Sequence, residues 1–427
     1  MKRFFYRLDL TLTSDGGVLD PVLPGVARPG QPSQPDAIPV VGLGNEPWLP
    51  GASLAGAFRE HLVDSEVPSA LVDRLMGAGG ASTTPSRVRV LGGFWRGAAG
   101  PAYESIQSTA IDRRRGAARS STLRTIRVLA AGASFRTYWE ADDLAEEEQQ
   151  AMLDALSTWR PLIGRAVTSG YGETATSNLA WGVLDTSTEP DLERLLTLSG
   201  PSLVNAVATR TLPVREGTAR EAVRLLLDIV APLHVGYGEM DGNRNLIRRR
   251  DSRYVVPGQS LRGVLRSRID HILASVGAPS CVSQNCRCLS CEIFGAVDDV
   301  SGRRARVRVA DALIDDAAKG EIEHVAIDRF TGGARDSALY SDEVVIAGRL
   351  TVRVEDLTAS SLLWRRTAAL LRLVVEDMNR GYVVLGGSGQ RGYGRVRYVS
   401  RPDDGLPDLG EAQRVLWEHL AEAEVSG

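Results

Sequence analysis

All four cysteines of the chain lie within one short segment, and they are Cys281, Cys286, Cys288 and Cys291. Four thiolates this close in sequence can complete the tetrahedral shell of a zinc ion, and such a closed shell leaves no position for a reactive water. His271 and His324 are alternative ligands if one cysteine does not bind. A disulfide is disfavoured in a reducing cytoplasm. The segment therefore predicts a structural zinc site that folds a loop.

Two aspartates in polar loops are the candidates for catalysis. Asp36 lies in QPDAIPV and Asp241 lies in EMDGNRN, each between the first predicted strand of its half of the chain and a Pro-Gly-x-Ser turn. A loop aspartate most often serves as a turn residue. The five histidines form no Ser/His/Asp or HExxH arrangement. Any hydrolysis would therefore depend on carboxylates.

The Pro-Gly-x-Ser turns are suited to bind phosphate. Each opens a predicted helix, with Ser53 and Ser260 expected as the N-cap residues. Free backbone amides at the start of a helix attract anions. Arg262 can add a charge-assisted hydrogen bond in the second turn.

A second candidate phosphate site is the glycine-dense loop near the C-terminus, which contains Gly386, Gly387 and Arg391. Glycine lets a backbone approach a ligand closely and form amide nests around anions. The loop lacks the GxxxxGK[ST] pattern of a nucleoside triphosphate site. An ordinary flexible hairpin is the alternative reading of the same residues.

The composition is that of a globular protein with an unusual choice of cation. The chain has 427 residues, of which 43% are hydrophobic and 24% charged. Lys2 and Lys319 are the lysines, and the remaining basic residues are arginine, which suits phosphate contacts and stacking on bases. No apolar run is long enough to span a bilayer, and the N-terminus alternates like a strand rather than a signal peptide. We expect a cytoplasmic protein with no membrane partner.

The chain contains an internal duplication. Three segments recur in the same order, which predicts one unit at residues 1–205 and a second at 215–427, with the boundary inside Thr186–Gly217. The second unit alone contains cysteines, so it alone carries the zinc site. The recurring pairs are LPGASLAG and VPGQSLRG, AIDRRRGAARSSTL and AIDRFTGGARDSAL, and the GYG motifs at Gly170–Gly172 and Gly392–Gly394.

Each unit has the same predicted layout. A first strand (Phe4–Thr13 and Ala222–Ala231) precedes the polar loop and the helix-opening turn. Further strands and an arginine-bearing loop follow, and a second helix (Glu146–Trp159 and Leu362–Asn379) precedes the glycine-rich loop and a closing strand. Strands and helices mixed in this order indicate an α+β fold.

Taken together, these segments resemble the RAMP superfamily, and most closely the backbone subunits of type III CRISPR-Cas effector complexes in a fused two-repeat form. The resemblance covers nearly all of the second unit and is looser in the first. It is carried by LHVGYGEMDGN, VVPGQSLRGVLRSRI, the cysteine cluster with CEIFG, VRVADA, HVAIDRFTGGARDSALYSDE and LGGSGQRGYGRV.

The resemblance implies a ferredoxin-like (RRM-related) core in each unit. It also implies that the chain binds CRISPR RNA and target RNA alongside other subunits of an effector complex. The IDRxTGGAR segment would be a thumb-like hairpin that flips one nucleotide of the guide–target duplex. The residues that the resemblance assigns to RNA binding are Ser53, Ser260, Arg262, Arg113, Arg119, Arg329, Thr331, Arg335, Gly386, Gly387 and Arg391.

The resemblance further implies a metal-dependent endoribonuclease that cleaves target RNA. Its cleaving aspartate would be Asp241 in the second unit and Asp36 in the first, with Mg²⁺ or another divalent metal as cofactor. Three other readings remain open at this point. They are a purely structural backbone subunit, a RAMP-fold ribonuclease that processes the CRISPR transcript, and a zinc-stabilised interaction protein without RNA.

Overall fold

The computed structural model divides into two compact units, each described here by itself. The first consists of Met1–Ile106, Arg124–Val167 and Tyr171–Ala219, and the second of Gln107–Leu123, Thr168–Gly170 and Arg220–Gly427. Two short segments of the first half thus belong to the second unit. The described residues are 1–21, 36–42, 44–78, 84–99, 102–112, 117–217, 220–250, 252–279, 286, 288–296, 302–358 and 360–425.

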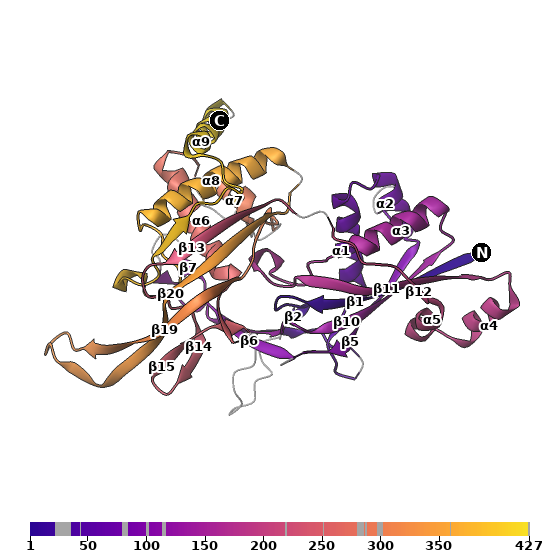
Figure 1. Cartoon of the computed structure of the whole chain (residues 1–427), viewed down its shortest axis with the longest axis horizontal. Helices are drawn as coiled ribbons and strands as arrows, with labels where there is room; N and C mark the ends of the chain where they lie inside the picture. Colours follow the sequence, from indigo (N-terminus) through magenta and orange to yellow (C-terminus); the bar gives the residue numbers. More distant parts are fainter. Residues whose placement is uncertain are drawn as a thin grey trace. The chain divides into compact units, whose positions relative to one another are not determined.

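The first unit is built on an antiparallel sheet with β1 at its centre (Figure 1). Strand β1 pairs with β10 on one side and with β11 on the other. The alternation of its residues places Phe4, Tyr6 and Leu8 on one face and Phe5 on the other, as expected for a strand buried on both sides. In sheet order, the strands are β12 (Arg210–Thr211), β11 (Thr174–Asp185), β1 (Lys2–Leu12), β10 (Ser134–Asp142), β5 (Val88–Gly97) and β4 (Trp48–Leu49).

Helices cover both faces of this sheet. On the main face, Phe58 of α1 meets Trp139 and Trp159 edge to face, with ring centroids 5.1 and 5.4 Å away. Such pairs add about 0.5–1.5 kcal/mol each beyond the area they bury. On the opposite face, Val204 of α5 packs against Phe5. The helices are α1 (Gly51–Asp64), α2 (Ser69–Met76), α3 (Glu146–Thr158), α4 (Glu189–Thr197) and α5 (Gly200–Val207).

A small second sheet in the first unit carries the loop of Asp36. Its strands are held by a cluster of Ile106, Val128 and Tyr171. A separate hairpin, β7 (Ile111–Asp112) with β8 (Ala117–Ala118), lies in the segment assigned to the second unit. In order, the strands of the small sheet are β2 (Leu19–Pro21), β3 (Ala37–Pro39), β9 (Arg124–Leu129) and β6 (Tyr103–Ser108).

The second unit is organised around the long strand β20. This strand pairs with β13, β18, β19 and, in parallel, with the short β15. Strand β13 pairs in turn with β21. The strands are β13 (Ala222–Ile229), β14 (Gly236–Asp241), β15 (Arg244–Ile247), β16 (Arg249–Arg250), β17 (Arg253–Val256), β18 (Val307–Val309), β19 (Ala312–Ile327), β20 (Ala334–Asp356) and β21 (Val396–Val399).

The helices α6, α8 and α9 of the second unit lie together on one side of its sheet (Figure 1). Helices α6 and α8 supply Leu265, Ile269, Leu371 and Val375 to a core that also takes Leu225 from β13. The apolar residues recur every three or four positions, which is the pattern of a half-buried helix. The helices are α6 (Gly258–Ser275), α7 (Leu289–Phe294), α8 (Ser361–Asn379) and α9 (Leu409–Val425).

The two units share one order of elements. In each, the first strand (β1 or β13) lies between β11 or β21 on one side and β10 or β20 on the other, and the latter strand also pairs with β5 or β18. The two main helices follow the first and third of these strands. The mixture of helices and strands confirms the α+β class. The predicted first strands and second helices agree with the observed bounds to within about two residues.

The expected N-cap role of Ser53 and Ser260 is wrong. Pro50 and Pro257 occupy the N-cap positions, and the serines are the third residues of α1 and α6. Proline is tolerated at a helix start because the amide it lacks has no partner within the helix. The amide of each serine instead donates to the carbonyl of its N-cap proline, at 3.0 and 2.9 Å.

The glycine of each helix-opening turn has a packing role. A Cβ atom at Gly51 would lie 2.1 Å from the carbonyl oxygen of Val90, and one at Gly258 would lie 2.2 Å from that of Val309. A side chain at either position would collide with the backbone of the neighbouring strand. The duplicated Pro-Gly-x-Ser motif therefore has a structural reason to recur, independent of any ligand.

Candidate functional site

The IDRFTGGAR segment forms the turn of the long hairpin made by β19 and β20. Asp328 Oδ1 accepts hydrogen bonds from the backbone amides of Phe330 and Thr331, both at 2.9 Å, and from Thr331 Oγ1 at 3.2 Å. The amide of Thr331, followed by that of Phe330, lowers the pKa of the Asp328 carboxyl. These bonds give the tip one defined shape.

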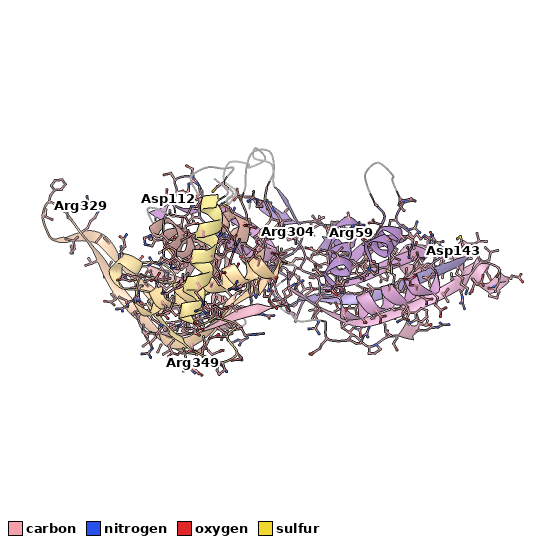
Figure 2. The ribbon with its side chains drawn as sticks, turned by 90° about the horizontal axis from the view of Figure 1, so that it is seen from above. Arg59, Asp112, Asp143, Arg304, Arg329 and Arg349 are labelled. Carbon is pink, nitrogen blue, oxygen red and sulfur yellow. The ribbon has the colours of Figure 1, made fainter. Side chains whose placement is uncertain are left out.

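The tip presents an aromatic ring and cations to solvent. Figure 2 shows Arg329 at the far end of the hairpin. The side chain of Phe330 is 98% exposed, and Arg329 and Arg335 are exposed as well. Exposed aromatic rings next to arginines are suited to stack on nucleic-acid bases. The strands below add the exposed apolar side chains of Ile327 and Leu339.

The equivalent segment of the first half forms the short hairpin of β7 and β8. Ile111 and Leu123, which correspond by the repeat to Ile327 and Leu339, are likewise exposed, at 53% and 70%. Arg119 is exposed, and its amide donates to the carbonyl of Ala110 at 2.8 Å. Arg113 lies outside the described residues. The repeated pattern of exposed apolar residues indicates a shared role for the two hairpins.

The two candidate aspartates have different surroundings. Asp241 ends β14, its side chain is 68% exposed, and it accepts a 2.6 Å hydrogen bond from Arg244 across the turn. Asp36 precedes β3, and its Oδ2 accepts the amide of Thr125 at 2.7 Å, which ties the loop to β9. Both aspartates are exposed, but the Asp36 carboxylate is bonded to the backbone of a neighbouring strand, whereas that of Asp241 is bonded to a side chain of its own turn.

An acidic side chain already accepts a hydrogen bond from the backbone amide at the start of α6. The amide of Gly258 donates to Asp311 Oδ1 at 2.6 Å, and Asp311 Oδ2 pairs with Arg250. Arg262, one turn into the helix, donates to the carbonyl of Phe294 and lies over its ring, 5.9 Å from the centroid. Burial lowers the pKa of Arg262 to about 10. The cation that the sequence assigns to RNA thus contacts the protein segment next to the cysteines.

The glycine-rich loop is shaped by contacts with the loop after β13. Gly386 has φ +76°, and a Cβ there would lie 2.3 Å from the carbonyl oxygen of His234. That same carbonyl accepts the amide of Gly387 at 2.9 Å. The exposed Arg391 donates to Tyr340 Oη at 2.8 Å. Part of the glycine content therefore follows from backbone geometry, while Arg391 remains at the surface.

A polar cluster that the sequence did not reveal joins this loop to the base of the long hairpin. His324 Nε2 lies 3.1 Å from Asp342 Oδ2 and 2.9 Å from Tyr393 Oη, and the ring of His324 stacks on Tyr340 at 5.0 Å. Asn245 of β15 donates to Asp342 Oδ1 at 2.7 Å. His324 Nε2 is engaged in this cluster, and among the described residues His324 is not grouped with the cysteines.

Three of the four cysteines come together. The sulfur atoms of Cys286, Cys288 and Cys291 all lie within 4.8 Å of one another, and Arg266 donates to Cys291 Sγ at 3.3 Å. Burial raises the pKa of the Cys288 thiol, and a bound cation would remove that proton. The trio is buried or partly buried and can hold a metal such as zinc. Cys281 lies outside the described residues.

Within the described residues, the cysteine trio is the one group of three or more His, Cys, Asp or Glu side chains that lie close enough to share a metal ion. Neither Asp36 nor Asp241 belongs to such a group. In the same part of the chain, no helix has the length and apolar character needed to cross a membrane.

Comparison with known proteins agrees with the duplicated architecture. The family model of the RAMP superfamily matches residues 17–174 and, again, residues 226–397. The two matches include both candidate aspartates, both helix-opening turns and the cysteine cluster. No curated protein matches the chain. The chain therefore belongs to the RAMP superfamily, in a form that carries two copies of the family's unit.

Proposed function

We propose that the chain is a guide-RNA-binding backbone subunit of a type III CRISPR complex that targets RNA, and that it acts in the cytoplasm with CRISPR RNA, target RNA and other subunits. The order of strands supports a ferredoxin-like core in each unit, because the β-α-β-β-α-β sequence with the first strand between the third and the fourth recurs. Related RRM domains bind single-stranded RNA on such sheets.

The observation that carries the proposal is the connection between the Asp241 turn and the long hairpin. Strand β15, which follows Asp241, pairs directly with β20, with Arg244 opposite Ser341 and Asn245 opposite Asp342. The candidate cleaving carboxylate and the arginine-bearing hairpin are thus parts of one hydrogen-bonded sheet. A nucleotide displaced by the hairpin would be presented on the same rigid element as Asp241.

The chemistry that fits this arrangement is attack by a ribose 2′-hydroxyl. Its oxygen forms a bond to the adjacent phosphorus while the bond from phosphorus to the 5′ oxygen breaks, giving a 2′,3′-cyclic phosphate and a 5′-hydroxyl. A flipped nucleotide brings the attacking and leaving oxygens into line, and such orientation accounts for much of the rate in intramolecular reactions. In this proposal Asp241 orients the 2′-hydroxyl, and Arg244 offsets the charge of the phosphate.

Mg²⁺ or another divalent ion is part of the proposed reaction, and among the described residues few protein ligands are available to hold it. Asp241 offers one carboxylate and belongs to no group of three or more metal-ligating side chains among those residues. Mg²⁺ commonly binds through one or two carboxylates together with substrate phosphates. An ion held this way would neutralise charge on the phosphate, and it would bind only when RNA is present.

We assign the cysteines to a structural zinc site. Cys286, Cys288 and Cys291 provide three thiols within reach of one ion, and Cys281 is the fourth ligand that the sequence offers. Four thiolates leave zinc no open position for water. Zinc would therefore fix the segment around α7 and take no part in cleavage.

Cleavage of labelled target RNA by the assembled complex tests the proposal. We expect Asp241→Ala to retain guide and target RNA but to lose one cut, and Asp36→Ala to have a smaller effect because of its bond to Thr125. Asp403→Ala is the matched control, since Asp403 is 74% exposed and pairs with Arg401. Unchanged products from Asp241→Ala would remove Asp241 from the mechanism, and unchanged products from both variants would favour a structural, non-cleaving backbone subunit.

A further inference from the structure

A cavity of about 320 Å³ opens beside the Asp241 turn. Its walls come from β15, the start of β16, the middle of β19 and one residue of β20, all in the second unit. Three of the side chains around it are cationic and one is acidic. The lining residues are Arg244, Leu246, Ile247, Arg249, Lys319 and Glu343.

Glu343 is the acidic residue of the cavity, and its side chain is 1% exposed. Its carboxylate accepts the amide of Ile247 at 3.0 Å and the hydroxyl of Tyr254 at 3.1 Å, and it pairs with Arg249 and Lys319. Burial alone would raise the pKa of Glu343, but the Ile247 amide, the Tyr254 hydroxyl and the Arg249 guanidinium together lower it. The carboxylate is therefore ionised, and protein groups occupy its hydrogen-bonding positions. Its ion pairs hold Arg249 and Lys319 at the cavity.

The cationic groups keep part of their surface open to solvent. The side chains of Lys319, Arg249 and Arg244 are 50%, 44% and 29% exposed. Arg244 Nε is buried, and within the described residues it has no hydrogen-bond partner. Within the lining these three cations face the Glu343 carboxylate, and Asp241 and Glu321, outside the lining, offset the charge of Arg244. Partly exposed cations and an unused arginine donor favour an anion that can take over these contacts.

Arg244 connects the cavity to the candidate cleaving residue. Its guanidinium donates to Asp241 at 2.6 Å, and another of its nitrogens lies 3.7 Å from Glu321. A planar guanidinium matches two oxygens of a phosphate as well as it matches a carboxylate. A phosphate that entered the cavity would compete with Asp241 for this guanidinium and would leave the Asp241 carboxylate free to contact RNA.

We propose that this cavity receives a backbone phosphate of the target RNA strand, held by Lys319, Arg249 and Arg244. The inference rests on the proposed function and adds a phosphate-binding site that positions the strand next to Asp241. The three residues are positioning residues. They lie on β15, β16 and β19, and Glu343 contacts a residue of each of these strands. The site is therefore formed before RNA binds. Lys319 has a further distinction, because it is one of two lysines in a chain whose other basic residues are arginine.

Titration of the guide-loaded protein with labelled complementary RNA at several salt concentrations tests the site. Lys319→Met removes the charge but keeps the length of a half-exposed side chain, so the fold should be retained. Lys2→Met is the matched control, because it removes the chain's other lysine, which is exposed at the start of β1 in the first unit. We expect Lys319→Met to weaken target binding several-fold and to lower the slope of log affinity against log salt by about 1, with guide binding unchanged.

The outcomes separate the two proposals. Wild-type protein that retains no guide RNA would contradict the proposed function. Target affinity and salt slope equal in Lys319→Met and Lys2→Met would overturn the cavity assignment. The same variants titrated with unpaired RNA in the absence of guide test the cavity independently, and there too Lys319→Met should lose one phosphate contact. Binding of inorganic phosphate that Lys319→Met weakens, without any change in RNA affinity, would also overturn the assignment to RNA.

Discussion

The backbone amide of Gly258 and the carboxylate of Asp311 meet at 2.6 Å, at the start of α6. An acidic side chain of the same unit thus lies at the positive end of this helix, where an anion is stabilised by the helix dipole and the unpaired amides. Asp311 also pairs with Arg250, and its side chain is 5% exposed.

Replacement of Asp311 by alanine should destabilise the second unit. The change leaves the Gly258 amide and the Arg250 guanidinium without this buried carboxylate, which costs about 1–3 kcal/mol for an amide and more for a charged group. Chemical denaturation measures the effect, and Asp403→Ala on an exposed loop is the control. Equal denaturation midpoints for the two variants would show that Asp311 does not cap the helix.

The tip of the long hairpin should keep its shape down to acidic pH. The folded pKa of Asp328 is depressed below the ordinary value of 3.8, so its contribution is present above that value and is lost as the pH falls through the folded pKa. Amide exchange at Phe330 and Thr331 measures the order of the tip. We expect Asp328→Ala to exchange rapidly at all pH values, and Asp328→Asn to keep part of the protection. If wild-type protection were already lost on lowering the pH from 7 to 5, this assignment would be contradicted. That range lies on the order of two units above the ordinary aspartate pKa.

Removal of a cysteine should release metal from the second unit. Cys291→Ser is expected to lose bound zinc and to lower the unfolding temperature, because binding energy at a structural site is also folding energy. Ser290→Ala is the control, since Ser290 is buried next to Cys291 but offers no thiol. Metal content by mass spectrometry and thermal unfolding are the measurements. Equal zinc content in both variants would exclude Cys291 as a ligand.

Two glycines of the C-terminal loop should differ sharply in their tolerance of alanine. A Cβ at Gly394 would lie 1.9 Å from the carbonyl oxygen of Leu385, whereas at Gly392 it would meet nothing within 4 Å. Both have positive φ, which costs an alanine about 1–2 kcal/mol. Gly392→Ala should lose about that amount in unfolding free energy, and Gly394→Ala should lose clearly more. Similar losses would mean that the loop relaxes around the added methyl group.

Asp356 should make the second unit less stable as the pH rises. Burial, opposed by the Thr358 amide and reinforced by the charge of Glu221, raises the pKa of Asp356 to about 6. A folded pKa above the unfolded value gives stability that is present at low pH and is lost as the pH rises through the folded value. Asp356→Asn should therefore stabilise the protein at pH 7 and flatten its stability profile between about pH 4 and 7. Denaturation curves at several pH values check both expectations, and an unchanged profile would reject them.

Much of the fold was predictable because its signals are local. The alternation in β1 and the helical spacing in α8 placed these elements within about two residues. Helices α4 and α5 were missed inside the stretch assigned to the boundary. α4 is short and carries no buried residue, and α5 is short and stabilised mainly by packing on Phe5 and Tyr138. A helix held by tertiary contacts gives a weak sequence signal.

The candidate site was predictable only where one segment contains all its parts. The cysteine cluster and the Asp328 turn are such cases. The contacts of His324 with Tyr393 and of Lys319 with Glu343 join residues distant in sequence, and strand pairing brings them together. No sequence pattern indicated that the Asp311 carboxylate would accept a hydrogen bond from the Gly258 amide. The scarcity of lysine was the one available signal for Lys319.

That scarcity has a practical consequence for chemical labelling. Lys319 is the sole lysine of the second unit, and half of its side chain surface is open. An amine-reactive reagent therefore has one side-chain target there, in the cavity that Arg244, the partner of Asp241, also lines. A fluorophore or photo-crosslinker attached at this amine would report on whatever strand passes the cavity, and no other residue of the unit would have to be engineered first.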